Sequence, residues 1–480
     1  MAEHLLKFIN LAKAMPDKRA AGFRRADFQE IYDRFRPAAA AAQASRCSQC
    51  GVPFCQVHCP LQNNIPDWLK LTAEGRLEEA YEIASATNTF PEICGRICPQ
   101  DRLCEGNCVI EQSGHGTVTI GAVERYITDT AFEMGWVKPI RPAREREQSV
   151  GIVGAGPAGL AAAEFLRRKG YQVTVYDRHD RVGGLLIYGI PNFKLEKPIV
   201  LRRAEQLTEG GIQFSLNCEL GRDVTLADLR RRHDAVLLAI GVYQAREMAG
   251  PGSGLDNIVP ALSYLTASNR KGLGDGVPEF DSGALDARGK RVVVIGGGDT
   301  AMDCVRTAVR QGATSVHCVY RRDRANMPGS QREVAHAEEE GIEFVWQAQP
   351  EAFLGDADNR VTGVRCQHIH LGLPDATGRH APRVIEGSSF AIEADLAIKA
   401  LGFDPEDVAA MTGSRDLALT NWGTVKVDWR SLMTNLPGVF AAGDIVRGAS
   451  LVVWAIRDGR DSAAAIDSYV TQARAKLAAE

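Results

Sequence analysis

The sequence has no apolar run of the roughly 20 residues that a helix needs to cross a bilayer. It also has little net charge, −4 over 480 residues, so no bulk attraction to nucleic acid or anionic lipid is expected. Its first residues, MAEHLLKFINLAK, lack the basic segment and apolar core of a signal peptide. These absences predict a soluble, cytoplasmic chain with no nucleic-acid or membrane partner, and the length predicts roughly three domains.

Cysteine is plentiful but unevenly placed. Eight of the twelve cysteines lie between Cys47 and Cys108, in runs spaced C-x2-C-x4-C-x3-C-P and C-x3-C-P-x4-C-x3-C. In a reducing cytosol such clustering favours metal binding over disulfide bonds. Four cysteines in each short run, with a C-x3-C-P ending, favour two [4Fe–4S] clusters. Structural zinc and disulfides are the alternatives. The predicted ligands are Cys47, Cys50, Cys55, Cys59, Cys94, Cys98, Cys104 and Cys108.

A first glycine motif lies in the segment SVGIVGAGPAGLAAAEFLRRKGYQVTVYD, which predicts strand, turn, helix and strand. Gly154 permits a tight turn, Gly156 lets the backbone approach a pyrophosphate, and Gly159 allows the helix to pack closely on the strand. Asp177, at the end of the second strand, suits ribose hydroxyls and would repel a 2′-phosphate. The motif therefore predicts a site for FAD or NAD, and a purely structural turn is the alternative.

A second motif occurs about 140 residues later in RVVVIGGGDTAMDCVRTAVRQGATSVHCVYRR. It has the G-x-G-x-x-A form, and no acid stands at the end of its second strand. Two arginines there offer forked donors suited to a phosphate dianion, which selects NADP over NAD unless they merely line a solvated turn. The predicted NADPH-binding residues are Gly296, Gly298, Asp299, Thr300, Ala301, Arg321 and Arg322.

Two more segments resemble the two-dinucleotide flavoprotein reductases: LLAIGVYQAR, residues 237–246, and TNLPGVFAAGD, residues 434–444. In that superfamily the second segment is an FAD signature whose aspartate contacts the ribityl chain. The following helix, expected to begin near Ser450, directs a partial positive charge at the flavin. The resemblance assigns the first motif to FAD. The predicted FAD residues are Gly154, Gly156, Pro157, Ala158, Gly159, Asp177, Arg178, Gly184, Gly241, Gly443 and Asp444.

The predicted fold is α/β, with two Rossmann-like dinucleotide-binding domains preceded by a helical iron–sulfur domain. The iron–sulfur domain is expected over residues 1–146, ending in a charged linker at 138–148. The FAD domain is expected to be split into 147–255 and 400–480, with the NADPH domain, 256–399, inserted between the two parts. Within that insert, residues 355–390 alternate apolar segments and turns, which predicts an excursion of β-strands.

Essentially the entire chain resembles the small (β) subunit family of NADPH-dependent glutamate synthase, through the cysteine runs, YGIPNFKLEK, VYRRDRANMPGS and AAGD. The cysteine region is also similar to the N-terminal domain of dihydropyrimidine dehydrogenase. That resemblance implies one cluster on Cys47, Cys50, Cys55 and Cys108, and three ligands of the other from Cys59, Cys98 and Cys104. For the fourth ligand, Cys94 and Glu124 both remain candidates, because a glutamine serves in the comparable place in dihydropyrimidine dehydrogenase.

The family implies that NADPH gives a hydride to FAD and that electrons leave through iron–sulfur centres. Their destination is a large subunit, where FMN reduces 2-iminoglutarate to glutamate. The sequence shows neither an N-terminal nucleophilic cysteine nor a barrel for FMN, so the chain is expected to act within a hetero-oligomer. No cysteine pair of a disulfide reductase stands in DRVGGLLIYGIPNFKLEK, and no protein acid, base or nucleophile is required. The alternatives are the same module serving another acceptor, or a zinc-containing nucleotide sensor.

Overall fold

The computed structural model describes residues 6–374 and 380–477, and it begins with a helical region that ends near residue 133. Buried side chains such as Trp68, Leu69 and Ile127 form its core. Its helices are η2 (Lys7–Ile9), α1 (Ala21–Arg24), α2 (Pro37–Ala44), α3 (Phe54–Val57), α4 (Ile65–Ala73), α5 (Leu77–Thr87), α6 (Pro91–Ile97), α7 (Val109–Gln112) and α8 (Ile120–Glu133).

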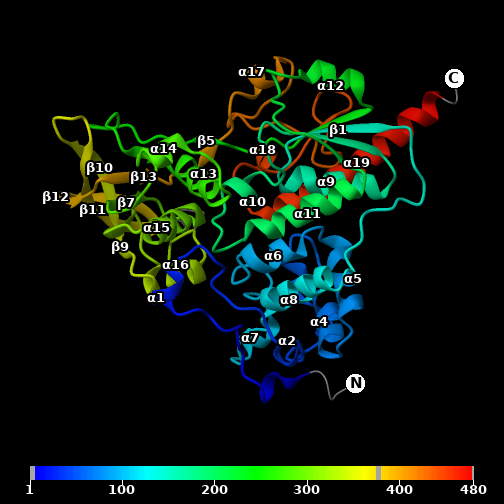
Figure 1. Ribbon diagram of the computed structural model, residues 1–480, viewed down its shortest axis with the longest axis horizontal. Coiled ribbons are helices and arrows are strands. Elements are labelled where there is room, and N and C mark those ends of the chain that lie inside the picture. Colours follow the sequence, from blue (N-terminus) through cyan, green and yellow to red (C-terminus); the bar gives the residue numbers. More distant parts are fainter. Residues whose placement is uncertain (1–5, 375–379, 478–480) are drawn as a thin grey trace.

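The first dinucleotide-binding fold is a five-stranded parallel sheet in the order β15-β4-β1-β2-β3. Its strand β1 is labelled in Figure 1. Its strands are β1 (Ser149–Val153), β2 (Gln172–Tyr176), β3 (Gln213–Ser215), β4 (Ala235–Leu238) and β15 (Val439–Ala441). Because β15 comes from the end of the chain, this unit is assembled from two separate stretches of sequence. Its helices are α9 (Pro157–Arg168), α10 (Leu185–Tyr188), α11 (Lys197–Glu209), α12 (Leu226–Arg232), α17 (Val408–Thr412), α18 (Asp444–Arg447) and α19 (Val452–Leu477).

The second fold is also a five-stranded parallel sheet, in the order β6-β13-β7-β8-β9. The strands are β6 (Ile258–Pro260), β7 (Arg291–Ile295), β8 (Ser315–Tyr320), β9 (Glu343–Trp346) and β13 (Leu396–Lys399). Its helices are α13 (Ala261–Gly272), α14 (Pro278–Asp281), α15 (Asp299–Gln311) and α16 (Gln331–Glu339). The predicted fold class, with two Rossmann-like units after a helical region, is confirmed.

Two smaller sheets complete the architecture. An antiparallel sheet of β10 (Ala348–Gly355), β11 (Val361–Pro374) and β12 (His380–Glu393) occupies the region expected to hold a β-excursion. The short strands β5 (Gln244–Ala245) and β14 (Phe403–Asp404) pair where the chain enters and leaves the second unit. The pairing of β5 with β14 fits the prediction that the first unit consists of two stretches with the second unit inserted between them. The residue boundaries of the units stay a prediction. Within the described residues, no helix is long and apolar enough to span a membrane.

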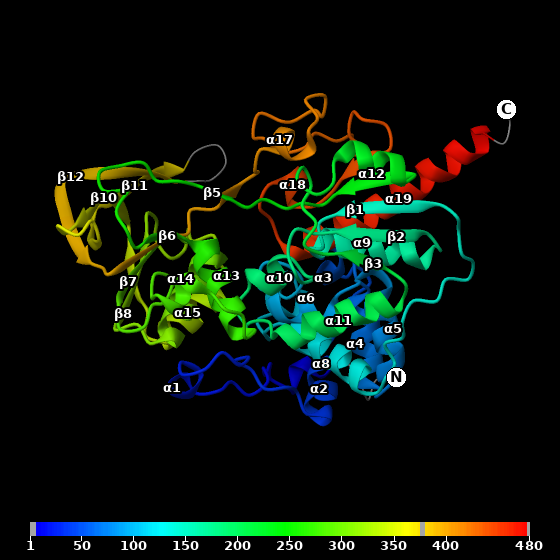
Figure 2. The same ribbon diagram turned by 45° about the horizontal axis from the view of Figure 1, so that its top comes forward.

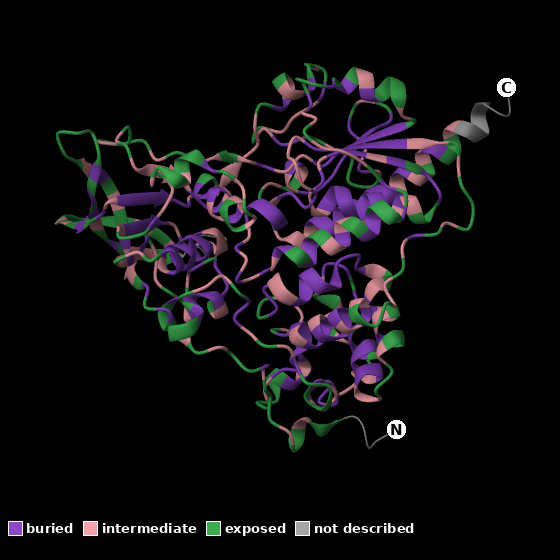
Figure 3. Ribbon diagram, viewed as in Figure 1, coloured by how far each residue is buried: buried purple, intermediate pink, exposed green. Residues whose placement is uncertain are grey.

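Residues 10–36, called the N-terminal segment from here on, lie between η2 and α2 in the sequence. They reach across to the second dinucleotide-binding unit, as the dark-blue trace in Figure 2 shows. Lys18 and Tyr32 form an isolated antiparallel bridge within this segment. Arg24 is buried, and its guanidinium lies 3.0 Å from the carboxylate of Glu340, which follows α16. Burial is concentrated in the two parallel sheets and their helices, whereas much of the β11–β12 hairpin is exposed (Figure 3). Through the contact of Arg24 with Glu340, the N-terminal segment joins the cysteine-rich region to the second unit.

Candidate active site

The first glycine motif forms the turn between β1 and α9. Gly154 has φ +108°, and a Cβ there would lie 2.2 Å from the Ala239 carbonyl oxygen. A Cβ at Gly159 would lie 1.9 Å from the Gly154 carbonyl oxygen. Only glycine fits these two places. Gly156 differs, because it has φ −82° and open space around it, so the protein itself does not require glycine there. That open space is what a pyrophosphate approaching the helix N-terminus needs.

A pocket opens beside this turn. Its wall comes from both stretches of the split unit and includes eight predicted FAD residues: Gly154, Gly156, Pro157, Ala158, Asp177, Arg178, Gly241 and Asp444. Gly159, Gly184 and Gly443 do not line it but support its wall, since a Cβ at either Gly184 or Gly443 would come within 2.9 Å of the α9 turn. The glycine turn and the apolar lining of the pocket fit a flavin dinucleotide.

The charged residues at the end of β2 are held by the protein itself. Asp177 accepts hydrogen bonds from the backbone N–H of Ala155, at 2.7 Å, and of His179, at 2.8 Å. Its carboxylate therefore fixes the glycine turn as well as facing the pocket. Arg178 makes a bidentate ion pair with Glu406 and lies 4.7 Å from the centre of the Tyr243 ring. His179 and Tyr243 also line the pocket but are not among the predicted site residues, although Tyr243 lies within the segment LLAIGVYQAR.

The C-terminal part of the pocket surrounds the start of α19. Asp444 accepts a hydrogen bond from the Ser450 hydroxyl at 2.8 Å, and burial raises the pKa of Asp444 to about 6. Leu451 and Val452 also line the pocket. The 26-residue helix therefore directs its N-terminus at the pocket, as expected, although it begins at Val452. A partial positive charge there suits a reduced, anionic flavin.

The second glycine motif faces the same pocket. Gly296 has φ +147° at the end of β7, Gly298 precedes α15, and Asp299, Thr300 and Ala301 form the first turn of that helix. Thr300 is part of the wall of this pocket, which is called the FAD pocket from here on after its predicted ligand. The second motif therefore contributes a residue to the pocket beside the first motif, and direct transfer between a nicotinamide and a flavin requires such closeness.

The arginines after β8 are not equivalent. Arg321 is exposed, whereas Arg322 is half-buried and donates through Nε to the carbonyl oxygen of His380, at 3.3 Å. The nearby Arg324 is paired with Glu338 at 2.6 Å. Arg321 is therefore exposed and, among the described residues, is not engaged as Arg322 and Arg324 are, which leaves its guanidinium available to a 2′-phosphate.

The eight clustered cysteines line two separate cavities. Cys47, Cys50, Cys55 and Cys108 line the first. The second is lined by Cys59, Cys94, Cys98, Cys104 and also by Glu124. This grouping crosses the two sequence runs in the way that the resemblance implies. The role of each side chain as a ligand stays a prediction.

The chemistry of these cavities fits iron–sulfur clusters. Burial raises the pKa of Cys47 and Cys59 to about 11 and that of Cys55 to about 12, so the thiols need a cationic partner to ionise. Within the described ranges, no three His, Cys, Asp or Glu side chains converge as they would on one metal ion. Four cysteines lining each cavity match the number of thiolates that an iron–sulfur cluster takes.

The second cysteine cavity adjoins the FAD pocket. Val453 lines the cavity, and its neighbour Val452, at the start of α19, lines the FAD pocket. Cys218, which is half-buried, also lines the FAD pocket. These positions define a class of protein: a flavin-dependent pyridine-nucleotide oxidoreductase with an iron–sulfur domain.

Comparisons with known proteins agree with this class. Residues 24–136 match the family described as dihydropyrimidine dehydrogenase domain II, 4Fe-4S cluster, and residues 148–459 match the pyridine nucleotide-disulphide oxidoreductase family. The glutamate synthase [NADPH] small chain of Azospirillum brasilense is 68% identical over 97% of this chain and 96% of that protein. The protein of the same name from Escherichia coli K12 is 46% identical over 98% of this chain and 100% of that protein.

A solved structure supports the fold of the two dinucleotide-binding units. Mycobacterium tuberculosis FprA in complex with NADPH has a TM-score of 0.58 and 18% identity, covering 69% of this chain and 86% of that one.

The chain belongs to the family of glutamate synthase [NADPH] small chains. Its cofactors are FAD, NADPH and iron–sulfur clusters, and the number of clusters stays a prediction.

Proposed function

We propose that this chain is the NADPH-oxidising, electron-input subunit of a glutamate synthase. The observation that carries the proposal is the meeting of three sites: Thr300 of the NADPH motif lines the FAD pocket, and Val452 and Val453 join that pocket to the second cysteine cavity. When bound, FAD takes two electrons as a hydride from NADPH and can release them singly to iron–sulfur clusters.

The chain's own residues bind and orient. Gly156 and Gly298 leave room for the two pyrophosphates at helix N-termini, and Arg321 offers its guanidinium to the 2′-phosphate of NADPH. The N-terminus of α19 and the Asp444 carboxyl bound to Ser450 hold the flavin end of the pocket. No side chain is assigned as an acid, base or nucleophile. The proposed domain limits are 1–146, 147–255 with 400–480, and 256–399.

The proposed partner is a large subunit that carries FMN and reduces 2-iminoglutarate to L-glutamate, so that the functional protein is a hetero-oligomer. Support comes from the relatives, which are named small chains. The first cysteine cavity supplies a way out for electrons, because its Cys50 and Cys55 are half-exposed. The apolar side chains of Val52, Phe54 and Val57 beside them are also exposed, which suits a protein interface.

The test is to isolate the chain with its natural partner and to assay NADPH oxidation. The proposal predicts oxidation that depends on both glutamine and 2-oxoglutarate and that yields glutamate. A complex that oxidises NADPH only with another acceptor, such as a ferredoxin or a pyrimidine, would contradict the glutamate assignment and favour the same module in another enzyme.

A further inference from the structure

The segment Met327–Ser330, here called the crossing loop, lies directly on the second glycine motif. The backbone N–H of Gly329 donates to the Gly297 carbonyl oxygen at 3.0 Å, and the N–H of Ser330 donates to the Asp299 carboxylate at 2.9 Å. A Cβ at Gly329 would lie 3.2 Å from the Gly297 oxygen. Because the crossing loop contacts Gly297 and Asp299, its position helps to determine the shape of the predicted pyrophosphate site.

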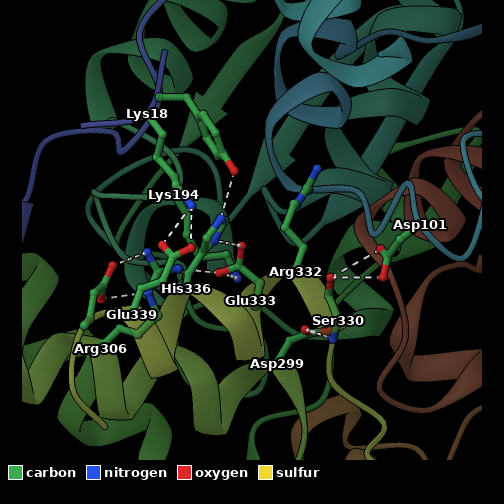
Figure 4. Close-up of polar contacts among 12 residues, drawn as sticks. Lys18, Asp101, Lys194, Asp299, Arg306, Ser330, Arg332, Glu333, His336 and Glu339 are labelled. Carbon is green, nitrogen blue, oxygen red and sulfur yellow. Dashed lines mark hydrogen bonds and ion pairs between the residues drawn. The ribbon is translucent and has the colours of Figure 1, made fainter. Parts of the chain in front are cut away.

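The other side of the crossing loop is held by the iron–sulfur domain. The Arg102 guanidinium donates to the carbonyl oxygens of Gly329, at 2.8 Å, of Met327, at 3.4 Å, and of Pro328. In Figure 4, Ser330 lies between Asp299 and Asp101, and its hydroxyl donates to the Asp101 carboxylate at 3.3 Å. Arg102 stands in the sequence between the predicted cluster ligands Cys98 and Cys104.

A second arginine bridges the same two domains from the opposite side. Arg332, in α16 of the NADPH-binding unit, donates to the Gln100 side-chain oxygen at 2.7 Å and to the Cys98 carbonyl oxygen at 3.4 Å. Two arginines, one from each domain, therefore tie the cysteine loop 98–104 to the crossing loop and the start of α16. Arginine is suited to this because its planar fork reaches several acceptors at once.

We propose that Arg102 is a positioning residue for NADP(H): it holds the crossing loop against the second glycine motif, so that nucleotide affinity depends on the iron–sulfur domain. The inference rests on the proposed assignment of Gly296–Ala301 to NADPH. Coupling between two sites is reciprocal, so NADP⁺ binding in turn stabilises the cysteine loop 98–104. Arg332 supports the same contact from the NADPH-binding side.

The test uses the full-length holoprotein and measures the NADP⁺ dissociation constant by calorimetry. Arg102→Ala is expected to weaken NADP⁺ binding about tenfold, because charge-assisted hydrogen bonds to the loop are lost. Arg102→Lys should recover part of the affinity. The matched control is Arg76→Ala, which removes an exposed arginine of the same domain that contacts Glu74 and Glu79. It should bind NADP⁺ as the wild type does.

Two further readouts separate positioning from general damage. In NADPH oxidation with ferricyanide as acceptor, Arg102→Ala should raise KM for NADPH and leave kcat unchanged. In hydrogen exchange, NADP⁺ should slow the amides of residues 98–104 in the wild type and not in Arg102→Ala. Arg332→Met, which leaves the cysteine loop's own sequence intact, should also weaken NADP⁺ binding and decides the matter if Arg102→Ala loses iron.

Wild-type affinity in both Arg102→Ala and Arg332→Met would overturn this inference while leaving the NADPH site in place. A wild-type protein that binds no NADP⁺ would instead overturn the assignment of the site itself. The two failures are therefore distinguishable in one set of titrations.

Discussion

Cys94 and Glu124 are both hydrogen-bonded to the side chain of Asn88 in the wall of the second cysteine cavity. The Cys94 thiol donates to the Asn88 oxygen at 3.7 Å, and the Asn88 amide donates to the Glu124 carboxylate at 3.2 Å. Burial raises the pKa of Glu124 to about 8. A buried thiol is an ordinary small hydrophobic group, whereas a buried carboxyl without a cation is rare unless it binds a metal. A carboxyl in this cavity is harder to account for than one more thiol, so we expect Glu124 to be the fourth ligand of the second cluster.

The first prediction follows from this difference. Glu124→Ala should remove about half of the iron and one of the two cluster signals in electron paramagnetic resonance. Cys94→Ala should keep both signals. Loss of a signal in Cys94→Ala, with both retained in Glu124→Ala, would assign the ligand to Cys94 instead.

The second prediction concerns the choice between NADPH and NADH. Arg321→Ala should raise KM for NADPH about tenfold or more, because a charge-assisted bond to the 2′-phosphate is lost, and should change KM for NADH little. Arg322→Ala should have a smaller effect, since that guanidinium already donates to His380. Arg324→Ala is the control, because Arg324 is paired with Glu338. Equal effects on the two nucleotides would contradict the assignment.

The third prediction separates glycines needed by the fold from glycines needed by the ligand. Gly156→Ala should fold with an unchanged melting temperature in the flavin-free protein but bind FAD at least about tenfold more weakly, since only the ligand approaches that position. Gly154→Ala should destabilise the flavin-free protein itself, because its Cβ would meet the Ala239 carbonyl at 2.2 Å. Thermal unfolding with and without FAD measures both effects. Normal FAD affinity in Gly156→Ala would place the pyrophosphate elsewhere.

The fourth prediction concerns the ion-pair cluster that the N-terminal segment completes. Glu340 is fully buried and pairs with Arg24, Arg306 and Arg310. Glu340→Gln should lower the free energy of unfolding by about 3 kcal/mol, because it leaves buried arginines without a counter-charge. Glu339→Gln, at the half-exposed neighbouring carboxylate, should cost less than about 1 kcal/mol. Denaturant unfolding of the two variants compares them directly, and equal losses would contradict the argument.

The same carboxylate sets a pH dependence. Against the opposing effect of burial, hydrogen bonds and charges from Arg310 and Arg306 lower the pKa of Glu340 to about 2 from its usual 4.5. A lowered carboxyl pKa contributes stability that is complete above pH 4.5 and is lost as the pH falls toward 2. The wild type should therefore lose more stability than Glu340→Gln over this range. Parallel losses in the two proteins would contradict the shift.

Local sequence was enough to predict the parts of the site that local geometry determines. The turn at Gly154 and the start of α15 at Asp299 lie where the glycine spacing indicates, because tight turns and helix N-termini depend on a few adjacent residues. The two five-stranded parallel sheets follow from the same strand–turn–helix patterns. The β-excursion was expected over 355–390, but the three strands begin at Ala348 and continue to Glu393, because pairing with neighbours extends them.

Contacts between segments that are distant in the sequence could not be predicted from it. Nothing in the sequence marks Arg24 as the buried partner of Glu340, since these residues meet only when the N-terminal segment crosses to α16. Asp177 was expected to bind ribose, and its bonds to the backbone of Ala155 and His179 depend on the exact path of the turn. The joining of the cysteine loop to the crossing loop by Arg102 depends on how two complete domains pack.

The central claim is that electrons pass from NADPH to the flavin and on to iron–sulfur clusters within this one chain. The most direct measurement is an anaerobic titration of the purified holoprotein with NADPH, followed by absorption and electron paramagnetic resonance. The account predicts that NADPH bleaches the flavin bands together with the broad iron–sulfur absorption. A colourless zinc-containing protein, or flavin bands that NADPH leaves unchanged, would contradict it.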